Sequence, residues 1–226
     1  MPMRVILAIL VAGGLTVALV VAVPTHAEPQ TCPPICDQIP DTAWIHPHAV
    51  PLDSAYNWPT LPGIAVPLTG AAAAPRFRFE DLCATPPRPQ DPRDFAVAAR
   101  ATVAHPDGQW QLQAQILHWR GDTASGGAIA ASVFSSALAA LRACQERVPQ
   151  QSPSITSDAP NRAAAVISGP IVVHTYLLAH VASSTVSELT LWSTGPPQVA
   201  WPALADDPVL DAMTAPLCDA YIASCP

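Results

Sequence analysis

The sequence predicts an α+β protein: a single antiparallel β-sheet with two helices on one face, stabilised by disulfides and preceded by a Pro-rich extended arm. Two patterns carry this prediction. Apolar and polar residues alternate through residues 109–119, as in a half-buried strand, and apolar residues recur at spacings of three and four through residues 129–144, as in an amphipathic helix. Six cysteines in 226 residues add the disulfides. We divide the chain into a signal peptide (1–27), the arm (28–74) and the α+β domain (75–226).

Residues 1–27 have the pattern of a secretory signal. Arg4 precedes an uninterrupted apolar run from Val5 to Val23, and small residues at Thr25 and Ala27 suit a cleavage site. Because the run nearly reaches the roughly 20 residues that span a bilayer, an uncleaved membrane anchor is the alternative. Both interpretations place the body outside the cytoplasm, secreted or in the cell envelope.

The arm is too proline-rich for long helices or interior strands, because each proline lacks a backbone donor. It opens with Cys32 and Cys36 and carries Trp44, Tyr56 and Trp58, which is too much apolar surface for a free linker. We therefore expect an extended segment held to the body by cysteines and aromatic anchors.

The body begins with a short predicted strand at 76–82. Alternating segments at 95–103 and 109–119 flank a Pro-Asp-Gly turn, which predicts an antiparallel hairpin. Residues 121–127 are expected to be flexible, with Thr123 or Ser125 capping a helix that ends at Cys144.

Residues 150–161 are polar and are expected to form a loop. Strands are predicted at 163–168, 171–182 and 185–192, and the middle one is apolar on both faces, which places it at the centre of the sheet. A last helix is expected from Asp206 to Cys225, kinked or interrupted by Pro216.

The even cysteine count favours three disulfides, with 15 possible connectivities. In one straight helix, Cys218 and Cys225 would lie about 10.5 Å apart along the axis, too far for a bridge. We therefore expect them to pair elsewhere, and Cys83 to be a natural partner for Cys144. No CxxC pair supports a zinc site. The expected disulfide residues are Cys32, Cys36, Cys83, Cys144, Cys218 and Cys225.

The net charge of −7 and the absence of clustered arginine argue against nucleic acid as a partner. There is no lysine, and 27 prolines are present, a composition typical of a GC-rich genome. Possible partners are a small apolar or glycan ligand or an envelope protein, with membrane contact only through an uncleaved signal segment. No cofactor is expected.

No motif specifies a reaction, and no catalytic residue is assigned. The sequence lacks a G-x-S-x-G elbow, and His46 and His48 have no obvious third metal ligand. His174 and His180 lie about 20 Å apart along one strand, so they cannot share a metal ion. Glu188 is the one carboxylate in an unexpected position, a strand, and we interpret it as exposed on the outer sheet face.

Aromatic and imidazole side chains could instead line a ligand groove. The candidates for such a groove are Trp44, Trp58, Trp119, His118 and His174.

The element order, with a helix ending Ala139-Ala140-Leu141-Arg142-Ala143-Cys144 and a last helix carrying a cysteine, resembles one actinobacterial family over residues 95–225. This is the family of the extracellular sensor domain of a mycobacterial Ser/Thr protein kinase, kinase H, and of related exported lipoproteins. The resemblance implies an antiparallel sheet with helices, two disulfides and a ligand cleft. Two features depart from the family pattern: Leu141 replaces a tryptophan, and strands 163–192 lack cysteine.

These observations favour a secreted or cell-envelope binding or sensing module without catalysis. One alternative is an envelope hydrolase, in which His118, His174 or His180 meets a distant serine and aspartate. The other is a protein-interaction subunit that uses the proline-rich arm.

Overall fold

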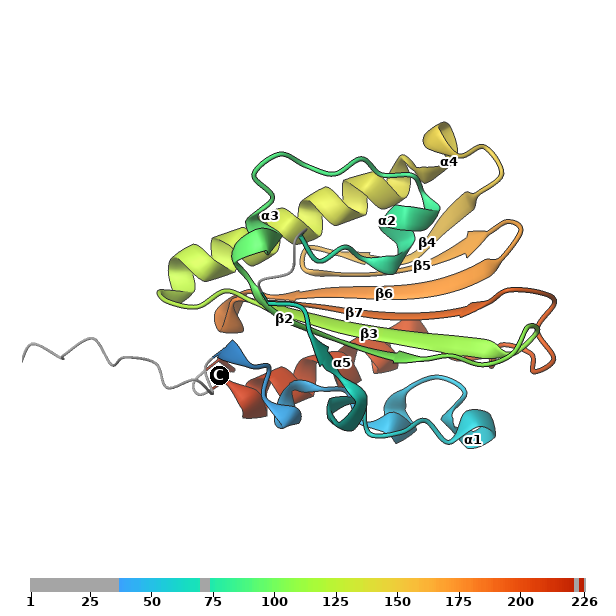
Figure 1. Ribbon diagram of the computed structural model, residues 1–226, viewed down its shortest axis with the longest axis horizontal. Helices are drawn as coiled ribbons and strands as arrows, with labels where there is room; N and C mark the ends of the chain where they lie inside the picture. Colours follow the sequence, from blue (N-terminus) through green and yellow to red (C-terminus); the bar gives the residue numbers. More distant parts are fainter. Residues whose placement is uncertain (1–36, 70–73, 222–223, 226) are drawn as a thin grey trace, which may run out of the picture. The chain divides into compact units, whose positions relative to one another are not determined.

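Seven antiparallel strands form one sheet in the order β1-β2-β3-β7-β6-β5-β4 in the computed structural model (Figure 1). The structure describes residues 37–69, 74–221 and 224–225. The predicted signal segment and the cysteines Cys32 and Cys36 lie outside the described residues. The strands are β1 (Val66–Pro67), β2 (Val97–Val103), β3 (Trp110–His118), β4 (Ser152–Ala159), β5 (Arg162–Ser168), β6 (Val172–His180) and β7 (Thr185–Ser193).

The α+β class and the single antiparallel sheet are confirmed. The expected antiparallel hairpin is formed by β2 and β3, with Ala101 opposite Ala114. The central strand, however, is β7, all of whose residues are buried, rather than the neighbouring β6.

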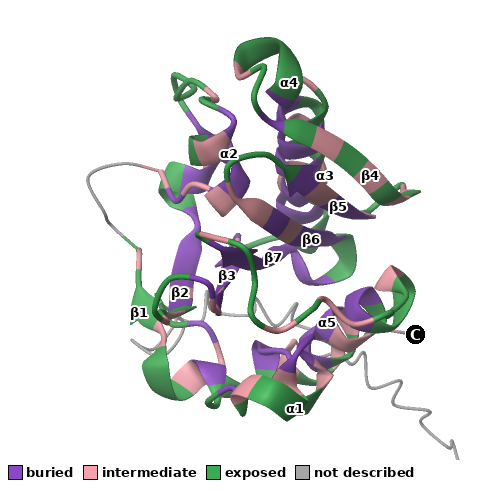
Figure 2. Cartoon of the chain, turned by 90° about the vertical axis from the view of Figure 1, so that its right-hand side faces the viewer, coloured by how far each residue is buried: buried purple, intermediate pink, exposed green. Residues whose placement is uncertain are grey.

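Residues 152–159, expected to be loop, form the edge strand β4. This strand pairs on one side only, and its residues alternate between exposed and half-buried (Figure 2). A strand with so little buried surface has no apolar alternation to reveal it, and its sequence therefore resembles a loop.

Helix α3 (Thr123–Arg142) covers one face of the sheet, with the short α4 (Cys144–Arg147) after it (Figure 1). Asp122, rather than Thr123 or Ser125, caps α3 by accepting hydrogen bonds from two backbone N–H groups. Among the described residues, α3 is the one helix long and apolar enough to cross a membrane, but half of its apolar window is buried in the fold. We interpret α3 as a core helix.

Two of the glycines in the segment expected to be flexible, Gly126 and Gly127, lie inside α3 and allow a close approach. A Cβ at Gly126 would lie 2.4 Å from Ser184 Oγ, and one at Gly127 would lie 2.6 Å from the carbonyl oxygen of Val181. The α3 backbone therefore rests directly on the turn η6 (Val181–Ser183).

The expectation that both helices lie on one face is wrong. Helix α5 (Asp206–Ala220) packs on the opposite face, where Leu210 and Met213 share a core with Leu189 and Leu191 of β7 (Figure 1). The arm covers the rest of that face. Its elements are η2 (Asp41–Ala43), η3 (Pro47–Ala49), α1 (Asp53–Tyr56) and η4 (Leu61–Ile64).

The predicted strand at 76–82 is also wrong, because residues Arg78–Leu82 form the short helix α2. Glu80 accepts a hydrogen bond from the backbone N–H of Phe77 and so holds the first turn. Phe77 and Phe79 are both buried beneath α3, so their spacing of two does not indicate a strand face. The turn η5 (Pro92–Phe95) then leads into β2.

Two disulfides lie within the described residues. The expected pair Cys83–Cys144 is present and fully buried. Cys218 and Cys225 are bonded to each other, contrary to expectation, because α5 ends at Ala220 and the Cα atoms come within 5.3 Å. Pro216 lies inside α5 without ending it. Such bonds persist in oxidising compartments and indicate a location outside the cytoplasm.

Candidate functional site

A pocket of about 440 Å³ lies between the arm and α5, and we call it the arm pocket. Its volume falls within the range of about 300–1,000 Å³ that is usual for small-molecule sites. The turns η2, η3 and η4 form one wall, and the C-terminal half of α5 forms the other. The lining residues are Asp41, Thr42, Trp44, Ile45, His46, Pro47, His48, Ala49, Thr60, Leu61, Pro62, Ala212, Ala215, Pro216 and Asp219.

The floor of the arm pocket is apolar, and its rim is polar. Trp44 and Leu61 are buried in the core beneath it. The exposed rings of His46 and His48 stack with centroids 5.6 Å apart. Asp219, on the α5 side of the pocket, is also exposed and has no ion pair within the described residues. The pocket therefore suits a ligand with an apolar body and a cationic or hydrogen-bonding group.

Proline accounts for this geometry. Pro47 and Pro62 each stand in the first turn of a 3-10 helix, where the missing N–H is not needed. The arm therefore runs as a series of single turns over α5, which buries some side chains and leaves a hollow between the turns and the helix.

His174 lines a second, more open hollow of about 480 Å³ at the start of α5. Its ring stacks on Trp201 with centroids 3.5 Å apart and meets the edge of Trp110. Burial lowers the pKa of His174 to about 4, so the imidazole is neutral at physiological pH. This stacking indicates a structural role for the ring.

The remaining groove candidates do not join the arm pocket. Trp58 is buried and donates its indole N–H to the carbonyl oxygen of Pro51, while Trp119 is buried beside α3 and donates to Pro92. His118 is half-buried and stacks on Tyr221. Of the five predicted groove residues, Trp44 alone lines the arm pocket.

The geometry offers little support for a hydrolase. His180 Nδ1 lies 2.7 Å from Ser183 Oγ, and His118 Nδ1 lies 3.2 Å from Thr185 Oγ1. Ser183 is buried, however, and within the described chain neither imidazole has a hydrogen bond to a carboxylate. A catalytic triad needs that third group to orient the histidine.

The aromatic surface expected for an interaction arm is also missing from the described residues. Trp44 and Trp58 are each only 4% exposed, so they anchor the arm to the body instead of facing solvent.

Glu188 was interpreted as exposed and is instead fully buried at the centre of the sheet. Its Oε1 accepts a hydrogen bond of 2.8 Å from the backbone N–H of Arg78, and its Oε2 lies 3.3 Å from Gln113 Nε2. Gln115 faces it across β3 and β7, and Gln115 Nε2 is buried without a partner in the described chain. Burial raises the pKa of Glu188 to about 7, despite the opposing charge of Arg100.

A buried ion cluster lies beside this carboxylate. Arg93 donates to Glu80 at 2.6 Å and to Asp91 at 2.7 Å, and all three residues are almost fully buried. Burial opposes the charged form of Arg93, but hydrogen bonds to the two carboxylates raise its pKa overall. The cluster joins α2 to η5 and is almost closed to solvent, so we interpret it as structural.

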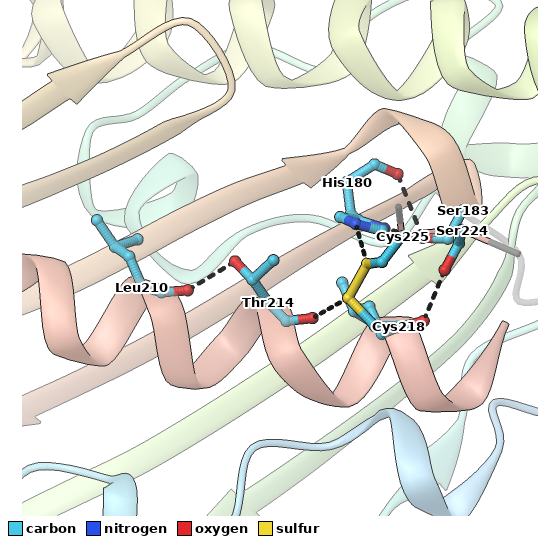
Figure 3. The surroundings of a disulfide bond; sticks show 8 residues. His180, Ser183, Leu210, Thr214, Cys218, Ser224 and Cys225 are labelled. Atoms are coloured by element: carbon cyan, nitrogen blue, oxygen red, sulfur yellow. Dashed lines mark hydrogen bonds between the residues drawn. A yellow bond between two sulfur atoms is a disulfide. The ribbon is translucent and has the colours of Figure 1, made fainter.

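A third group of chemically active side chains lies at the C-terminal end of α5. Potential ligand atoms of His180, Cys218 and Cys225 come within 4.8 Å of one another (Figure 3). The two sulfurs are bonded to each other, so they do not offer thiolates to a metal ion. The sequence indicated these residues separately but gave no sign that they meet.

Comparison with known protein-family models, with curated proteins and with solved structures found no match.

Proposed function

We propose that the protein is a non-catalytic binding or sensing module, secreted or held in the cell envelope, whose ligand occupies the arm pocket. The observation that carries this proposal is a preformed, mainly apolar hollow of about 440 Å³ with stacked imidazoles and carboxylates at its rim. Resemblance in element order to the extracellular domain of kinase H points in the same direction. The two disulfides agree with the proposed location.

The ligand class follows from the lining. An apolar floor favours a small apolar molecule, and the acidic rim favours one with a cationic or donor group over an anion. A bulky side chain introduced at the mouth should exclude such a ligand without disturbing the core. Ala215 suits this test because it is exposed and lines the pocket from α5.

The experiment uses N-phenyl-1-naphthylamine, an apolar amine that becomes fluorescent in apolar sites. We expect saturable binding to the wild-type protein and at least about tenfold weaker binding to Ala215→Trp, which corresponds to about 1.4 kcal/mol. Ala139→Trp is the matched control, since Ala139 is an exposed helical alanine on α3, across the sheet. Equal affinity in both variants would show that the probe binds outside the arm pocket, and absence of binding to the wild type would contradict an apolar ligand.

A further inference from the structure

The disulfide Cys218–Cys225 differs from the other described disulfide in its surroundings. Cys83 and Cys144 are fully buried, whereas Cys218 and Cys225 are both partly exposed. Nε2 of His180 lies 3.5 Å from Cys225 Sγ (Figure 3). An accessible disulfide with an imidazole at its sulfur can react with external thiols, which a buried disulfide does not meet.

The hydrogen bonds of His180 determine which nitrogen faces the sulfur as an acceptor. Ser183 Oγ donates to the backbone carbonyl oxygen of His180 at 3.2 Å, so its hydrogen is already engaged. Nδ1 of His180 lies 2.7 Å from the same oxygen, and because the serine hydrogen is engaged on the carbonyl we infer that this oxygen accepts the Nδ1–H. The ring is then protonated on Nδ1, and Nε2 directs its lone pair at Cys225 Sγ.

This lone pair has no function while the disulfide is intact, because neither sulfur carries a hydrogen. When the bond opens, the thiol of Cys225 can donate its proton to Nε2 and become a thiolate beside an imidazolium. Burial lowers the pKa of His180 and so favours the neutral imidazole, which can accept this proton.

The two sulfurs are not equivalent. Cys218 lies in the last turn of α5, at the negative end of the helix dipole, and its Sγ is 3.7 Å from the carbonyl oxygen of Thr214 (Figure 3). Both features disfavour a thiolate at Cys218 and favour a thiol that donates to this carbonyl. Because the more acidic thiol leaves faster in exchange, an external thiolate should attack Cys218 and release Cys225.

We propose that Cys218, Cys225 and His180 form a thiol–disulfide exchange site whose substrates are dithiol peptides or proteins outside the cytoplasm. A substrate thiolate attacks Cys218 Sγ, the Cys218–Cys225 bond breaks, and its electron pair leaves on Cys225. The substrate thiol has lost its proton to solvent, and the Cys225–His180 pair takes up one proton from solvent. The second substrate thiol then loses its proton and attacks the substrate sulfur of the mixed disulfide, so that the substrate disulfide forms and Cys218 leaves and takes up a proton as a thiol. Two electrons and two protons pass from the dithiol, which becomes a disulfide, to the site.

The first test compares the two disulfides of the folded protein. The full chain is treated with limiting dithiothreitol, quenched with iodoacetamide, and mapped by peptide mass spectrometry. We expect Cys218 and Cys225 to be reduced at least about tenfold faster than Cys83 and Cys144, which are fully buried. Equal rates would overturn the proposal.

Exposure alone could produce that difference, so the second test measures the role of His180. In the reduced, folded protein, the pH dependence of Cys225 alkylation should have a midpoint below about 7.5, and His180→Gln should return it to about 8.5. His118→Gln is the control, since His118 also ends a strand and hydrogen-bonds a hydroxyl group through Nδ1, but it contacts Thr185 in place of a cysteine. An unchanged midpoint in His180→Gln, with the wild-type circular dichroism spectrum retained, would overturn the role of the imidazole.

Discussion

The replacement of Glu188 by glutamine should remove a pH-dependent destabilisation. The structure buries this carboxyl completely at the centre of the sheet and raises its pKa from 4.5 to about 7. The folded protein therefore holds the group protonated over a pH range in which the unfolded chain ionises it. Glutamine has nearly the same shape and does not titrate.

The sign and size of the effect follow from linkage. Below about pH 4.5 the carboxyl is protonated in both states and has no effect. As the pH rises to about 7, the unfolded state loses its proton first, so the free energy of unfolding falls. The loss is complete above the folded pKa and amounts to about 3 kcal/mol, at 1.36 kcal/mol for each pKa unit.

The variant avoids this loss of stability, but part of the advantage is offset. The glutamine carbonyl can still accept from the backbone N–H of Arg78, but the attraction to Arg100 is lost. We expect Glu188→Gln to be about 1–3 kcal/mol more stable than the wild type at about pH 8, and near equality at about pH 4.5. At about 2–4 °C per kcal/mol, the melting temperature should differ by several degrees at the higher pH.

Urea denaturation of the oxidised protein across this pH range measures the difference directly. Other groups also titrate, so the informative quantity is the difference between the free energies of unfolding of the wild type and Glu188→Gln at each pH. Glu146→Gln, which makes the same change at an exposed position on α4, is the matched control. Parallel curves for the wild type and Glu188→Gln would refute the reasoning.

Three further predictions concern packing and charge. Gly127→Ala should destabilise the fold by about 1–3 kcal/mol in urea, because its Cβ would overlap the Val181 carbonyl; any stabilisation would contradict the close approach. Arg93→Met should cost about 3–5 kcal/mol, measured in the same way, because two buried carboxylates lose their partner; a neutral result would mean that the carboxylates reach solvent. The imidazole of His174 should titrate near pH 4 by NMR, since burial disfavours its charged form; a midpoint near 6.5 would contradict its burial against Trp201.

Strands that face the core could be predicted from the sequence, because burial on one face gives alternation and burial on both faces gives an apolar run. Segments β2, β3, β5, β6 and β7 were all predicted, with ends shifted by a few residues. Helix α3 was predicted for the same reason, since its buried face repeats every three or four residues. Cys83 and Cys144 were paired correctly because one cysteine follows that helix and the other lies in the loop before the hairpin.

Elements set by local or one-sided contacts were missed. The edge strand β4 carries little apolar surface, and α2 is one turn long, too short for a helical period. The Cys218–Cys225 pairing depended on where α5 ends, and element ends are the least certain part of a sequence prediction.

Prediction of the candidate sites was weaker still. The arm pocket depends on turns from the arm meeting a helix some 150 residues later, and no local pattern encodes such a meeting. Glu188 carried a usable signal, because it is the one charged residue of its strand and a buried carboxylate has to be accommodated somewhere. The interpretation as exposed failed because β7 is covered on both faces.

That double covering also explains why the arm belongs to the fold. The sequence already contained the evidence for two layers. The segment 171–182 is apolar on both faces, and such a strand implies a layer on each side of the sheet. Helix α3 supplies one layer, but α5 alone is too short to cover seven strands, and the arm supplies the remaining surface with Trp44, Trp58 and Leu61. Because the arm consists of short proline-bounded turns and not of a second long helix, its packing against α5 leaves a hollow. The arm pocket is thus a consequence of covering the second face with a proline-rich segment.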